Sequence, residues 1–498
     1  MTSSSEDETE AVPTGDRRRW LALIPLGLGT LIVVLDGTVL NVSLPSIRRD
    51  LGFDEGSLTW VVNAYVLAYG SLLLLGGRLG DIFSPRRLVL CGISFFTVAS
   101  VLCGLAETKA ELILGRALQG LGGSVMAAAS PALTMTLFSA VGERSRVLAI
   151  LGVVGITGTT IGVVVGGLVT SALGWHWVFL INGPMGVLLY ISCVSLIPVK
   201  KAAFKAQRID IWGAATITAS LATALYAVQN GGEVNFLSAR TLGLLGCSLA
   251  LLAAFVIIET RVSVPLMPLH VWKKRTFAVG NILCILSSLG GSSSGYMATL
   301  YMGGVLGYSP LRISLVFLPA GIVGAVFALG LSAKLISALG TRWSVSGGLL
   351  LGTLGLVLFS GAIANGATAN GLLFCLILTA IGSSVAFNAL SVAIIGEVPT
   401  SELGLASGVI NTISLMAASM GLAIFANVAR SHASHLLASG ASNGPAMGGG
   451  YQIAFVTNAV CVFLAALVAA VFLRTNTPDG AEATAVAASS APVAGDSV

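Results

Sequence analysis

Long apolar runs occupy the chain from residue 20 to residue 473, separated by short polar or charged stretches. A helix needs about 20 apolar residues to cross a hydrocarbon core of roughly 30 Å, and the runs reach that length. The pattern predicts membrane-spanning helices rather than strands or soluble core helices. Fourteen spans are expected, at about 20–44, 58–77, 88–106, 112–137, 147–173, 178–197, 211–229, 241–258, 277–301, 313–337, 343–364, 371–395, 403–428 and 451–473.

The composition supports this fold class and excludes a soluble protein. Of the 498 residues, 55% are hydrophobic and only 9% are charged, and the mean hydropathy is +0.93. A soluble domain has roughly a quarter of its residues charged, which a water-exposed surface requires. The seven cysteines fall singly inside apolar runs, so they are expected to be small buried side chains rather than disulfides or zinc ligands. The prediction is an all-α polytopic membrane protein.

Lys and Arg residues predict how the chain is oriented. With fourteen spans and the N-terminus inside, 19 of the 26 basic residues fall in inner loops and tails, six fall in outer loops, and Arg116 lies within a span. Cytoplasmic loops carry an excess of Lys and Arg, so both termini are expected in the cytoplasm. Residues 1–19 and 474–498 lack an apolar core and are expected to be disordered cytoplasmic tails.

Two basic connectors suggest how the spans are grouped. One follows the sixth span, at 199–210, and the other precedes the last six spans, at 259–276. The expected organisation is a six-helix bundle at 20–197, a linker with two further spans at 198–276, and a second six-helix bundle at 277–473. Transporters built from internal repeats have paired bundles of this kind.

Only two ionisable residues lie deep inside predicted spans, and they are the first candidate site. Asp36 is about 24 Å above the inner face and Arg116 is about 6 Å below the outer end of its span, so both lie in the outer half. Burial favours the neutral form of a carboxyl group and a nearby cation favours the ionised form, so Asp36 and Arg116 are predicted to handle a proton. The alternative is a structural ion pair.

A glycine-rich face in the fifth span is the second candidate. The glycines repeat every three or four residues and therefore share one side of the helix, forming a groove for a neighbouring helix; ordinary small-residue packing is the alternative reading. They are Gly152, Gly155, Gly158, Gly162 and Gly166, with Gly167 beside them.

The connector after the second span mixes one acidic residue with basic ones. An acid at a helix end facing guanidinium groups forms a charge latch that holds one conformation and breaks in another. Anchoring by the positive-inside rule explains the arginines but leaves Asp81 unexplained. The predicted latch comprises Gly77, Arg78, Asp81, Arg86 and Arg87.

Neutral polar side chains in the spans are candidates to line a cavity, with hydrogen bonding between helices as the alternative for each. They are Asn41, Asn63, Tyr65, Gln119, Asn281, Asn388 and Asn411.

Several chemistries have no support in the sequence. The chain contains no G-x-x-x-x-G-K-[ST] and no H-E-x-x-H motif, so it is not expected to be an enzyme of either kind. His432 and His435 have a metal-compatible spacing but no acid or cysteine nearby, which favours a solvated loop. Basic residues lie at predicted membrane edges, so nucleic-acid binding is not expected. No metal or cofactor is predicted.

Five stretches together resemble the major facilitator superfamily, in particular its fourteen-span drug:proton antiporters. They are 35–45 in span one, the loop 77–87, 116–122 in span four, 158–167 in span five and 175–184. The resemblance implies two six-helix bundles plus two extra central helices, a role for Arg116 in proton transfer, and an antiporter motif on the glycine face. This chain has Val163 where that motif has proline, Ser84 where the loop has glycine, and His176 where arginine is frequent.

The function expected from these features is proton-driven export of hydrophobic or amphiphilic drugs, in particular antibiotics, across the cytoplasmic membrane. The expected partners are the small-molecule cargo, protons and the lipid bilayer, and the chain is expected to work as a monomer. Two alternatives remain open at this point. One is a proton symporter that imports a small solute, and the other is a membrane receptor or scaffold that transports nothing.

Overall fold

The structure is a computed structural model that describes residues 20–82, 84–138, 141–197, 210–234, 238–262, 269–366, 369–396, 398 and 403–473, with some side chains in these ranges, those of 71–82 among them, left out. The predicted tails and most of the connector at 199–210 lie outside these residues. The N-terminal helices are α2 (Leu23–Leu51), α3 (Glu55–Ile82), α4 (Pro85–Gly104), α5 (Lys109–Leu137), α6 (Val141–Leu173), α7 (His176–Leu180) and α8 (Asn182–Leu196).

The remaining helices follow in the same order as the predicted spans. They are α9 (Ile211–Val234), α10 (Ala239–Arg261), the short η1 (Leu269–Lys273), α11 (Arg275–Gly304), α12 (Pro310–Val326), η2 (Phe327–Leu331), α13 (Ser332–Ala364), α14 (Ala369–Ile395), α15 (Leu403–Ala438) and α16 (Asn443–Phe472). Within the described residues the regular secondary structure is entirely helical, so the all-α prediction is confirmed.

Local sequence explains where several helices begin and end. Thr108 caps α5, because its side chain accepts from the N–H of Glu111 at 3.3 Å while the Glu111 carboxylate accepts from the N–H of Thr108 at 3.1 Å. Gly52 ends α2 in the left-handed region at φ +67°, which glycine adopts without strain. Gly340, at φ +76°, breaks the helical run from α12 to the end of α13. The tenth and eleventh predicted spans therefore meet at one residue instead of a loop.

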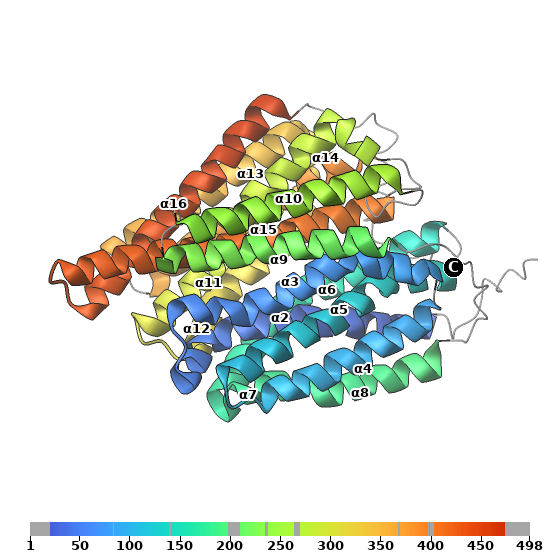
Figure 1. Cartoon of the computed structure of the whole chain (residues 1–498), viewed down its shortest axis with the longest axis horizontal. Coiled ribbons are helices and arrows are strands. Elements are labelled where there is room, and N and C mark those ends of the chain that lie inside the picture. Colours follow the sequence, from blue (N-terminus) through green and yellow to red (C-terminus); the bar gives the residue numbers. More distant parts are fainter. Residues whose placement is uncertain are drawn as a thin grey trace, which may run out of the picture.

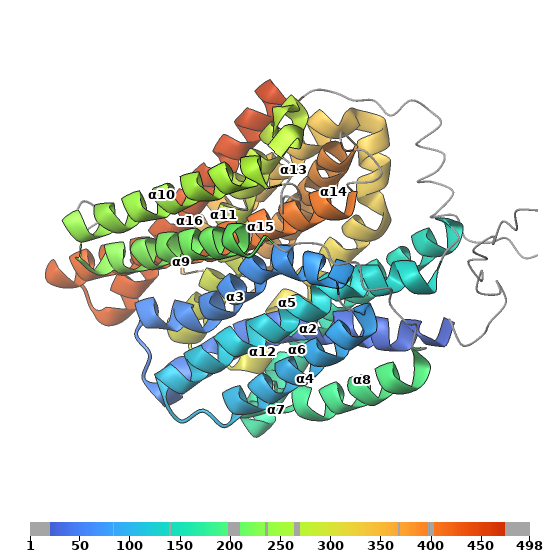
Figure 2. The same cartoon turned by 45° about the vertical axis from the view of Figure 1, so that its right-hand side comes forward.

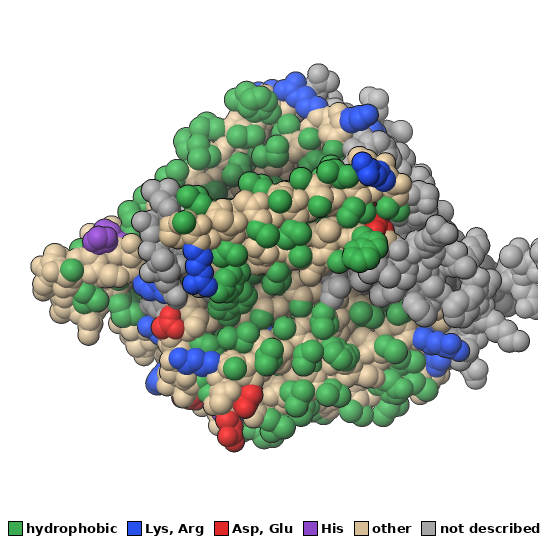
Figure 3. Space-filling view, viewed as in Figure 1, with side chains coloured by type: hydrophobic (Ala, Val, Ile, Leu, Met, Phe, Trp, Pro, Cys, Tyr) green, Lys and Arg blue, Asp and Glu red, His purple; other side chains and the backbone are tan. Residues whose placement is uncertain are grey.

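The outer surface has the polarity of a membrane protein. Among the described residues, nine helical stretches are long and apolar enough to cross a membrane, and one of them, Pro310–Ala364, covers two predicted spans. In Figure 3 apolar side chains cover the middle of the visible face, while Lys and Arg side chains gather towards its two ends. This is the distribution that a bilayer requires. The number fourteen stays a prediction.

The helices form two packed groups with a pair beside them. Helices α2 to α8 pack mainly on one another, and so do α11 to α16; Figures 1 and 2 show the first group in blue to teal-green and the second in yellow to red. Helix α10 packs on α9, and α9 lies against α3 and α15, one helix from each group. The division of the chain into domains at 20–197, 198–276 and 277–473 stays a prediction.

Matching contacts relate the two groups as repeats. Arg86 on α4 donates from Nη2 to the carbonyl of Val194 in the last turn of α8, and Arg342 on α13 donates in the same way to Ala470 in the last turn of α16. These carbonyls have no partner within their own helix, so each arginine caps a helix end. A shift of 256 residues therefore relates α4 to α13, and a shift of 276 residues relates α8 to α16.

Close glycine contacts extend the same register to α5 and α14. A Cβ on Gly92 of α4 would meet the backbone N of Met126 at 2.7 Å, and a Cβ on Gly348 of α13 would meet that of Ala386 at 2.8 Å. Gly122 faces the backbone of Phe96 in the first group as Gly382 faces that of Gly352 in the second. The α5 positions therefore map onto α14 with a shift of 260 residues.

The two groups contact each other at the end of the bundle that the charge distribution predicts to face outside, called the outer end below. Ser314 of α12 donates to the carbonyl of Val163 on α6 at 2.6 Å, and the N–H of Leu311 donates to Ser171 at 3.1 Å. A Cβ on Gly303 of α11 would lie 2.7 Å from the Pro45 ring of α2. In Figure 1 the two groups run together at the left and diverge towards the right. The structure therefore shows a closed outer end.

Gly303→Leu is expected to open this outer end, because the rigid ring of Pro45 leaves no room for a side chain at residue 303. A cysteine introduced at the buried Ser314 reports the change, and its labelling by an impermeant maleimide should rise several-fold in the Gly303→Leu background. Gly295→Leu on the same helix is the matched control, since a Cβ there meets no atom within 4 Å. Equal labelling in the Gly303→Leu and Gly295→Leu backgrounds would contradict a closed outer end.

Candidate functional site

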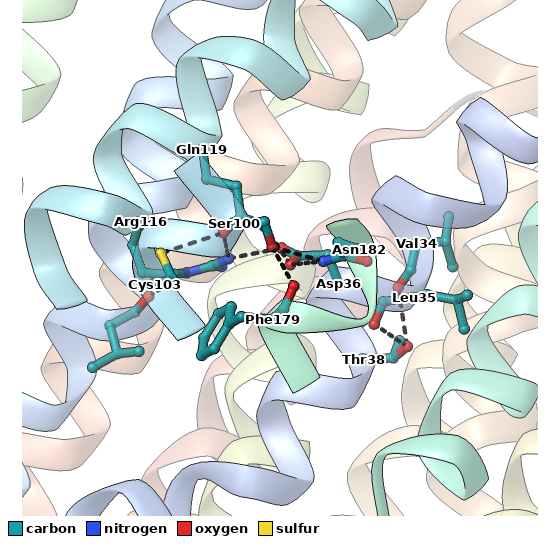
Figure 4. Close-up of polar contacts among 11 residues, drawn as sticks. Val34, Leu35, Asp36, Thr38, Ser100, Cys103, Arg116, Gln119, Phe179 and Asn182 are labelled. Atoms are coloured by element: carbon teal, nitrogen blue, oxygen red, sulfur yellow. Dashed lines mark hydrogen bonds and ion pairs between the residues drawn. The ribbon is translucent and has the colours of Figure 1, made fainter. Parts of the chain in front are cut away.

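Asp36 lies in the middle of α2 with 1% of its surface exposed, and its carboxylate accepts three hydrogen bonds. Arg116 Nη1 donates to Oδ2 at 2.7 Å. Gln119 Nε2 donates to Oδ1 at 2.6 Å, and Asn182 Nδ2 donates to the same oxygen at 3.2 Å. A carboxylate buried in hydrocarbon is costly unless it is paired and hydrogen-bonded, and Asp36 is both. Figure 4 shows these side chains converging on it.

Arg116 reaches this carboxylate from α5 and is equally buried, at 1% exposed. Its Nε donates to the carbonyl of Val61 on α3 at 2.9 Å, and its Nη1 also donates to Gln119 Oε1 at 2.6 Å. The guanidinium carbon lies 4.3 Å from the ring centroid of Tyr65, which adds a cation–π contact. Three helices therefore hold the cation in place, and the sequence-predicted pair of Asp36 and Arg116 is an ion pair in the structure.

Ser100 and Asn182 complete the network, and sequence reasoning missed both. Ser100 on α4 accepts from Gln119 at 3.1 Å and from Asn182 at 3.0 Å, and it donates to the carbonyl of Phe179 at 2.9 Å. Both residues are at most 2% exposed. A serine in an apolar run carries almost no sequence signal, because serine commonly bonds to its own helix. Asn182 lies in the 175–184 stretch, whose resemblance to the antiporter family is the sequence signal that could have identified it as a site residue.

All three neighbouring groups of the network donate N–H bonds to the oxygens of Asp36. A proton on the carboxyl group would turn an acceptor oxygen into an O–H that faces a donor. Protonation therefore loosens at least one of the three contacts. This coupling of a proton to side-chain positions is the chemistry that the arrangement allows.

The other predicted cavity-lining residues have separate environments. Asn63 accepts from Ser419 of α15 at 2.7 Å and so joins the two groups of helices. Asn388 donates to the carbonyl of Ala328 at 3.2 Å, and Asn281 donates within its own helix to Phe277 at 2.9 Å. Asn41 is half-buried and Asn411 is exposed, whereas Tyr65 and Gln119 belong to the Asp36 site. Asn63 and Asn388 therefore form hydrogen bonds between helices, which was the alternative to lining a cavity.

The glycine face of α6 packs on α2, at the helix that carries Asp36. A Cβ on Gly158 would lie 2.9 Å from Leu31, and one on Gly166 would lie 2.9 Å from the Cα of Val39. Gly162 faces Thr38, and Gly167 faces Ser314 of α12, across the seam between the groups. Gly155 has room, with its nearest atom on Thr30 at 3.9 Å. Helix α6 runs unbroken through Val163.

Gly166→Ala is expected to weaken the α2–α6 contact, since the added methyl group meets backbone atoms of Val39 that cannot rotate away. Overpacking of this kind costs about 1–3 kcal/mol. Thermal unfolding of the purified protein in detergent measures the effect as a lower midpoint. Gly155→Ala removes the same glycine flexibility on the same helix face but makes only an ordinary contact. A midpoint for Gly166→Ala as high as that of Gly155→Ala would show that α2 does not pack tightly here.

The predicted latch is only partly described. The side chains of Arg78 and Asp81, with Gly77, lie in the part of α3 outside the described side chains, so their contacts are not part of the structure. Arg86 caps α8 through the carbonyl of Val194, and Arg87 is exposed. Its contact to α8 gives Arg86 a structural role.

Metal binding finds no support in the described part of the chain, where no group of three or more His, Cys, Asp or Glu side chains is placed to hold an ion. His432 and His435, expected in an outer loop, lie instead on α15, which continues to Ala438; both are exposed. Helix α15 extends beyond its apolar run because the part of a helix that lies outside the membrane does not need apolar residues.

Comparison with known proteins identifies the class to which this fold and site belong. The profile of the Major Facilitator Superfamily matches residues 26–422. The puromycin resistance protein pur8 of Streptomyces alboniger is 33% identical over 476 residues, covering 94% of each chain. The cephamycin export protein CmcT of Amycolatopsis lactamdurans is 34% identical over 454 residues, covering 90% of this chain and 92% of that protein.

Solved structures agree on the fold. A bacterial homolog of the human lysosomal transporter Spinster, in an inward-facing and unoccupied conformation, is similar over 93% of this chain and 100% of that chain, with a TM-score of 0.68 and 15% identity. The D-xylose-proton symporter is similar over 92% of this chain with a TM-score of 0.65. The protein is a multi-pass membrane protein of the transporter class. It belongs to the Major Facilitator Superfamily.

Proposed function

We propose that this chain is a proton-coupled exporter of hydrophobic or amphiphilic drugs, antibiotics in particular, that works by alternating access. The observation that carries the proposal is the buried ion pair of Asp36 and Arg116 at the centre of a transporter fold. Ionisable groups at membrane depth are expensive and mark proton relays and substrate paths. Relatives named for puromycin resistance and cephamycin export support the direction and the class of cargo.

Proton binding at Asp36 drives the conformational change in this mechanism. In the present closed-outside state the carboxylate accepts hydrogen bonds from Arg116, Gln119 and Asn182. When the outer end opens, a proton enters and neutralises Asp36, which releases Arg116 and loosens α2 from α5 and α8. Return to the state open towards the inside restores the ion pair and expels the proton to the cytoplasm. Cargo leaves in the opposite direction.

Two further elements of the proposal concern the inner end and the surroundings. Asp81, Arg78 and Arg86 act as a latch that holds the inner end closed while the outer end is open. The protein works as a monomer in the cytoplasmic membrane with both termini inside, and the proton gradient supplies the energy without a cofactor. The import and receptor alternatives are not favoured, since the curated relatives are named as resistance or export proteins.

Everted membrane vesicles test the proposed function. Vesicles carrying the wild-type chain should accumulate puromycin or the dye Hoechst 33342 when respiration acidifies their interior, and a protonophore should collapse the accumulation. Vesicles without the chain are the control. Uptake that ignores the protonophore would contradict proton coupling, and solute accumulation by right-side-out cells under an inward proton gradient would contradict export.

A further inference from the structure

The second group of helices contains a cavity next to the place that corresponds to the ion pair of the first group. The cavity measures about 240 Å³ and lies among α11, α13, α14 and α16. Three of these helices, α13, α14 and α16, are the repeat counterparts of α4, α5 and α8, as the matched contacts above establish. The fourth, α11, is the counterpart of α2. The Asp36 site lies among the side chains of α2, α4, α5 and α8.

The repeat register places individual residues in correspondence. Gln119 maps onto Thr379 and Ser100 maps onto Leu356, and both Thr379 and Leu356 line the cavity. Asn182 maps onto Asn458, which donates to Ser293 of α11 at 3.2 Å, just as Asn182 donates to Asp36 of α2 at 3.2 Å. Ser293 therefore stands in the place of Asp36.

Both charges are missing from the second copy. Arg116 maps onto the buried Leu376, and Asp36 has Ser293 as its counterpart. Among the residues that the structure describes, the cavity lining contains no Asp, Glu, Lys, Arg or His side chain. The second copy is therefore unsuited to carry a proton or to pair with a charged ligand, since a buried charge needs a partner.

Smaller side chains in the second copy leave the empty volume, and the largest difference is at a glycine. Phe96 in the first group is 2% exposed and fills the space beside α5, whereas its counterpart in α13 is Gly352. Gly352 is buried and lines the cavity, yet a Cβ placed on it would meet no atom within 4 Å. Buried positions in a packed interior normally have neighbours at van der Waals distance. Replacement of an aromatic ring by hydrogen at this position leaves a space close to the size of a ring system.

One wall of the cavity lies beside α11 and α12. On α14, Ser384 and Ala380 lie 3.4 Å from a Cβ on Gly324 of α12, and Ser383 faces Gly291 of α11. Phe387 lies between these two faces of α14 and is 47% exposed, so it borders the mouth between α11 and α12. Helices α11 and α12 are the ones that contact α2 and α6 of the first group. The cavity therefore lies on the side of the second group where that group meets the first.

The polar atoms of the lining define the ligand chemistry. Ser287 donates to the carbonyl of Cys284 at 3.3 Å and Thr379 donates to that of Cys375 at 2.9 Å, which leaves lone pairs on both hydroxyl oxygens. Those oxygens accept from an N–H or O–H of a ligand. Leu349, Leu356 and Val462 supply an apolar wall. Drug-binding pockets occupy about 300–1,000 Å³, so a cavity of this size holds one ring system and not a whole cargo molecule.

We propose that this cavity, between α11, α13, α14 and α16, is a cargo-binding pocket for an uncharged ring that carries amide or hydroxyl donors. The proposal rests on the proposed export function and assigns its parts: the first group of helices handles the proton and the second group binds the neutral part of the cargo. Two differences between the copies matter most for these roles. Asp36 of the first group is replaced by Ser293 in the second, and Phe96 of the first group is replaced by Gly352.

Equilibrium binding tests the pocket without any proton gradient. Radiolabelled chloramphenicol, a neutral ring compound with amide and hydroxyl donors, serves as the probe for the purified chain in detergent. Gly352→Leu fills the cavity and should weaken binding at least about tenfold, the effect of roughly 1.4 kcal/mol. Gly347→Leu is the matched control, because it makes the same change on the same helix at an exposed position with no neighbour within 4 Å. Phe387→Ala at the mouth is a second test variant, and it should weaken binding several-fold without adding bulk to the interior.

The outcomes separate the pocket from the export function. Loss of binding in Gly352→Leu and Phe387→Ala, with wild-type binding in Gly347→Leu, supports the pocket. Wild-type affinity in both pocket variants, or no binding of the probe by the wild-type chain, overturns it. Tetraphenylphosphonium, a cation without donors, should bind all four proteins equally, and selective loss of its binding in the pocket variants would overturn the assigned chemistry. Binding without transport in everted vesicles would overturn the export function and leave the pocket standing.

Discussion

Asp36→Asn is expected to reduce proton-driven transport to the level of vesicles that lack the protein. Asparagine has the size of aspartate and keeps an oxygen for Gln119 and Asn182, but it cannot take up or release a proton. The amide NH2 group then faces Arg116, so the variant should be less stable than the wild type. It should still bind cargo, yet fail to couple a gradient to movement. Transport of Hoechst 33342 into everted vesicles gives the rate, and release of protons on addition of cargo, read with a pH-sensitive dye, gives the coupling.

Asp50→Asn is the matched control for this experiment. Asp50 lies at the end of α2 and accepts from Trp175 Nε1 at 3.0 Å, a bond that an asparagine oxygen also accepts. The control makes the same chemical change on the same helix but outside the buried network, so transport should stay near that of the wild type. Undiminished gradient-driven transport by Asp36→Asn would remove Asp36 from the mechanism.

Arg116→Met is expected to cause the largest loss of stability among the single variants. The change keeps much of the side-chain volume but leaves Asp36 buried with no cation, and it also removes the bond to Val61. Loss of one partner of a buried ion pair costs about 3–5 kcal/mol. The midpoint of thermal unfolding in detergent should fall by several degrees, and expression should fall with it.

The double variant Asp36→Asn with Arg116→Met separates the ion pair from simple packing. Both charges are then absent, as they are at Ser293 and Leu376 in the second copy, so much of the lost stability should return. Transport should remain absent, because no group is left to carry the proton. A double variant as unstable as Arg116→Met alone would mean that packing and the bond to Val61, and not the unpaired carboxylate, dominate the cost.

The sequence was sufficient to predict the helical elements because a membrane imposes a simple rule. Each apolar run of about 20 residues corresponds to a helix in the described structure, and the all-α fold follows. Helix ends were predicted less well. Helices α15 and α16 extend beyond their apolar runs, and α12 continues into α13 up to Gly340, because hydrogen bonding and turn geometry, which hydropathy does not detect, set where a helix ends.

Part of the candidate site could be predicted from the same rule. Charges are so rare in the apolar runs that Asp36 and Arg116 stand out, and their similar depth suggested a meeting point. Their ion pair, and the contribution of Asn182 and Ser100, depend on how α2, α4, α5 and α8 are arranged around one another. Serine and asparagine side chains form hydrogen bonds equally well with their own helix or with a neighbouring helix, so their partners cannot be derived from the sequence alone.

The sequence by itself determined that this is a helical membrane protein with two deep charges and a glycine face on α6. Those properties follow from which residues the hydrocarbon tolerates, and this is decided residue by residue. Only the tertiary structure decided that the two charges form one pair, that α4, α5 and α8 recur as α13, α14 and α16, and that Gly352 leaves a cavity where Phe96 fills the first copy. The reason is physical: an ion pair or a cavity belongs to several helices at once, and packing brings together residues that the chain keeps far apart.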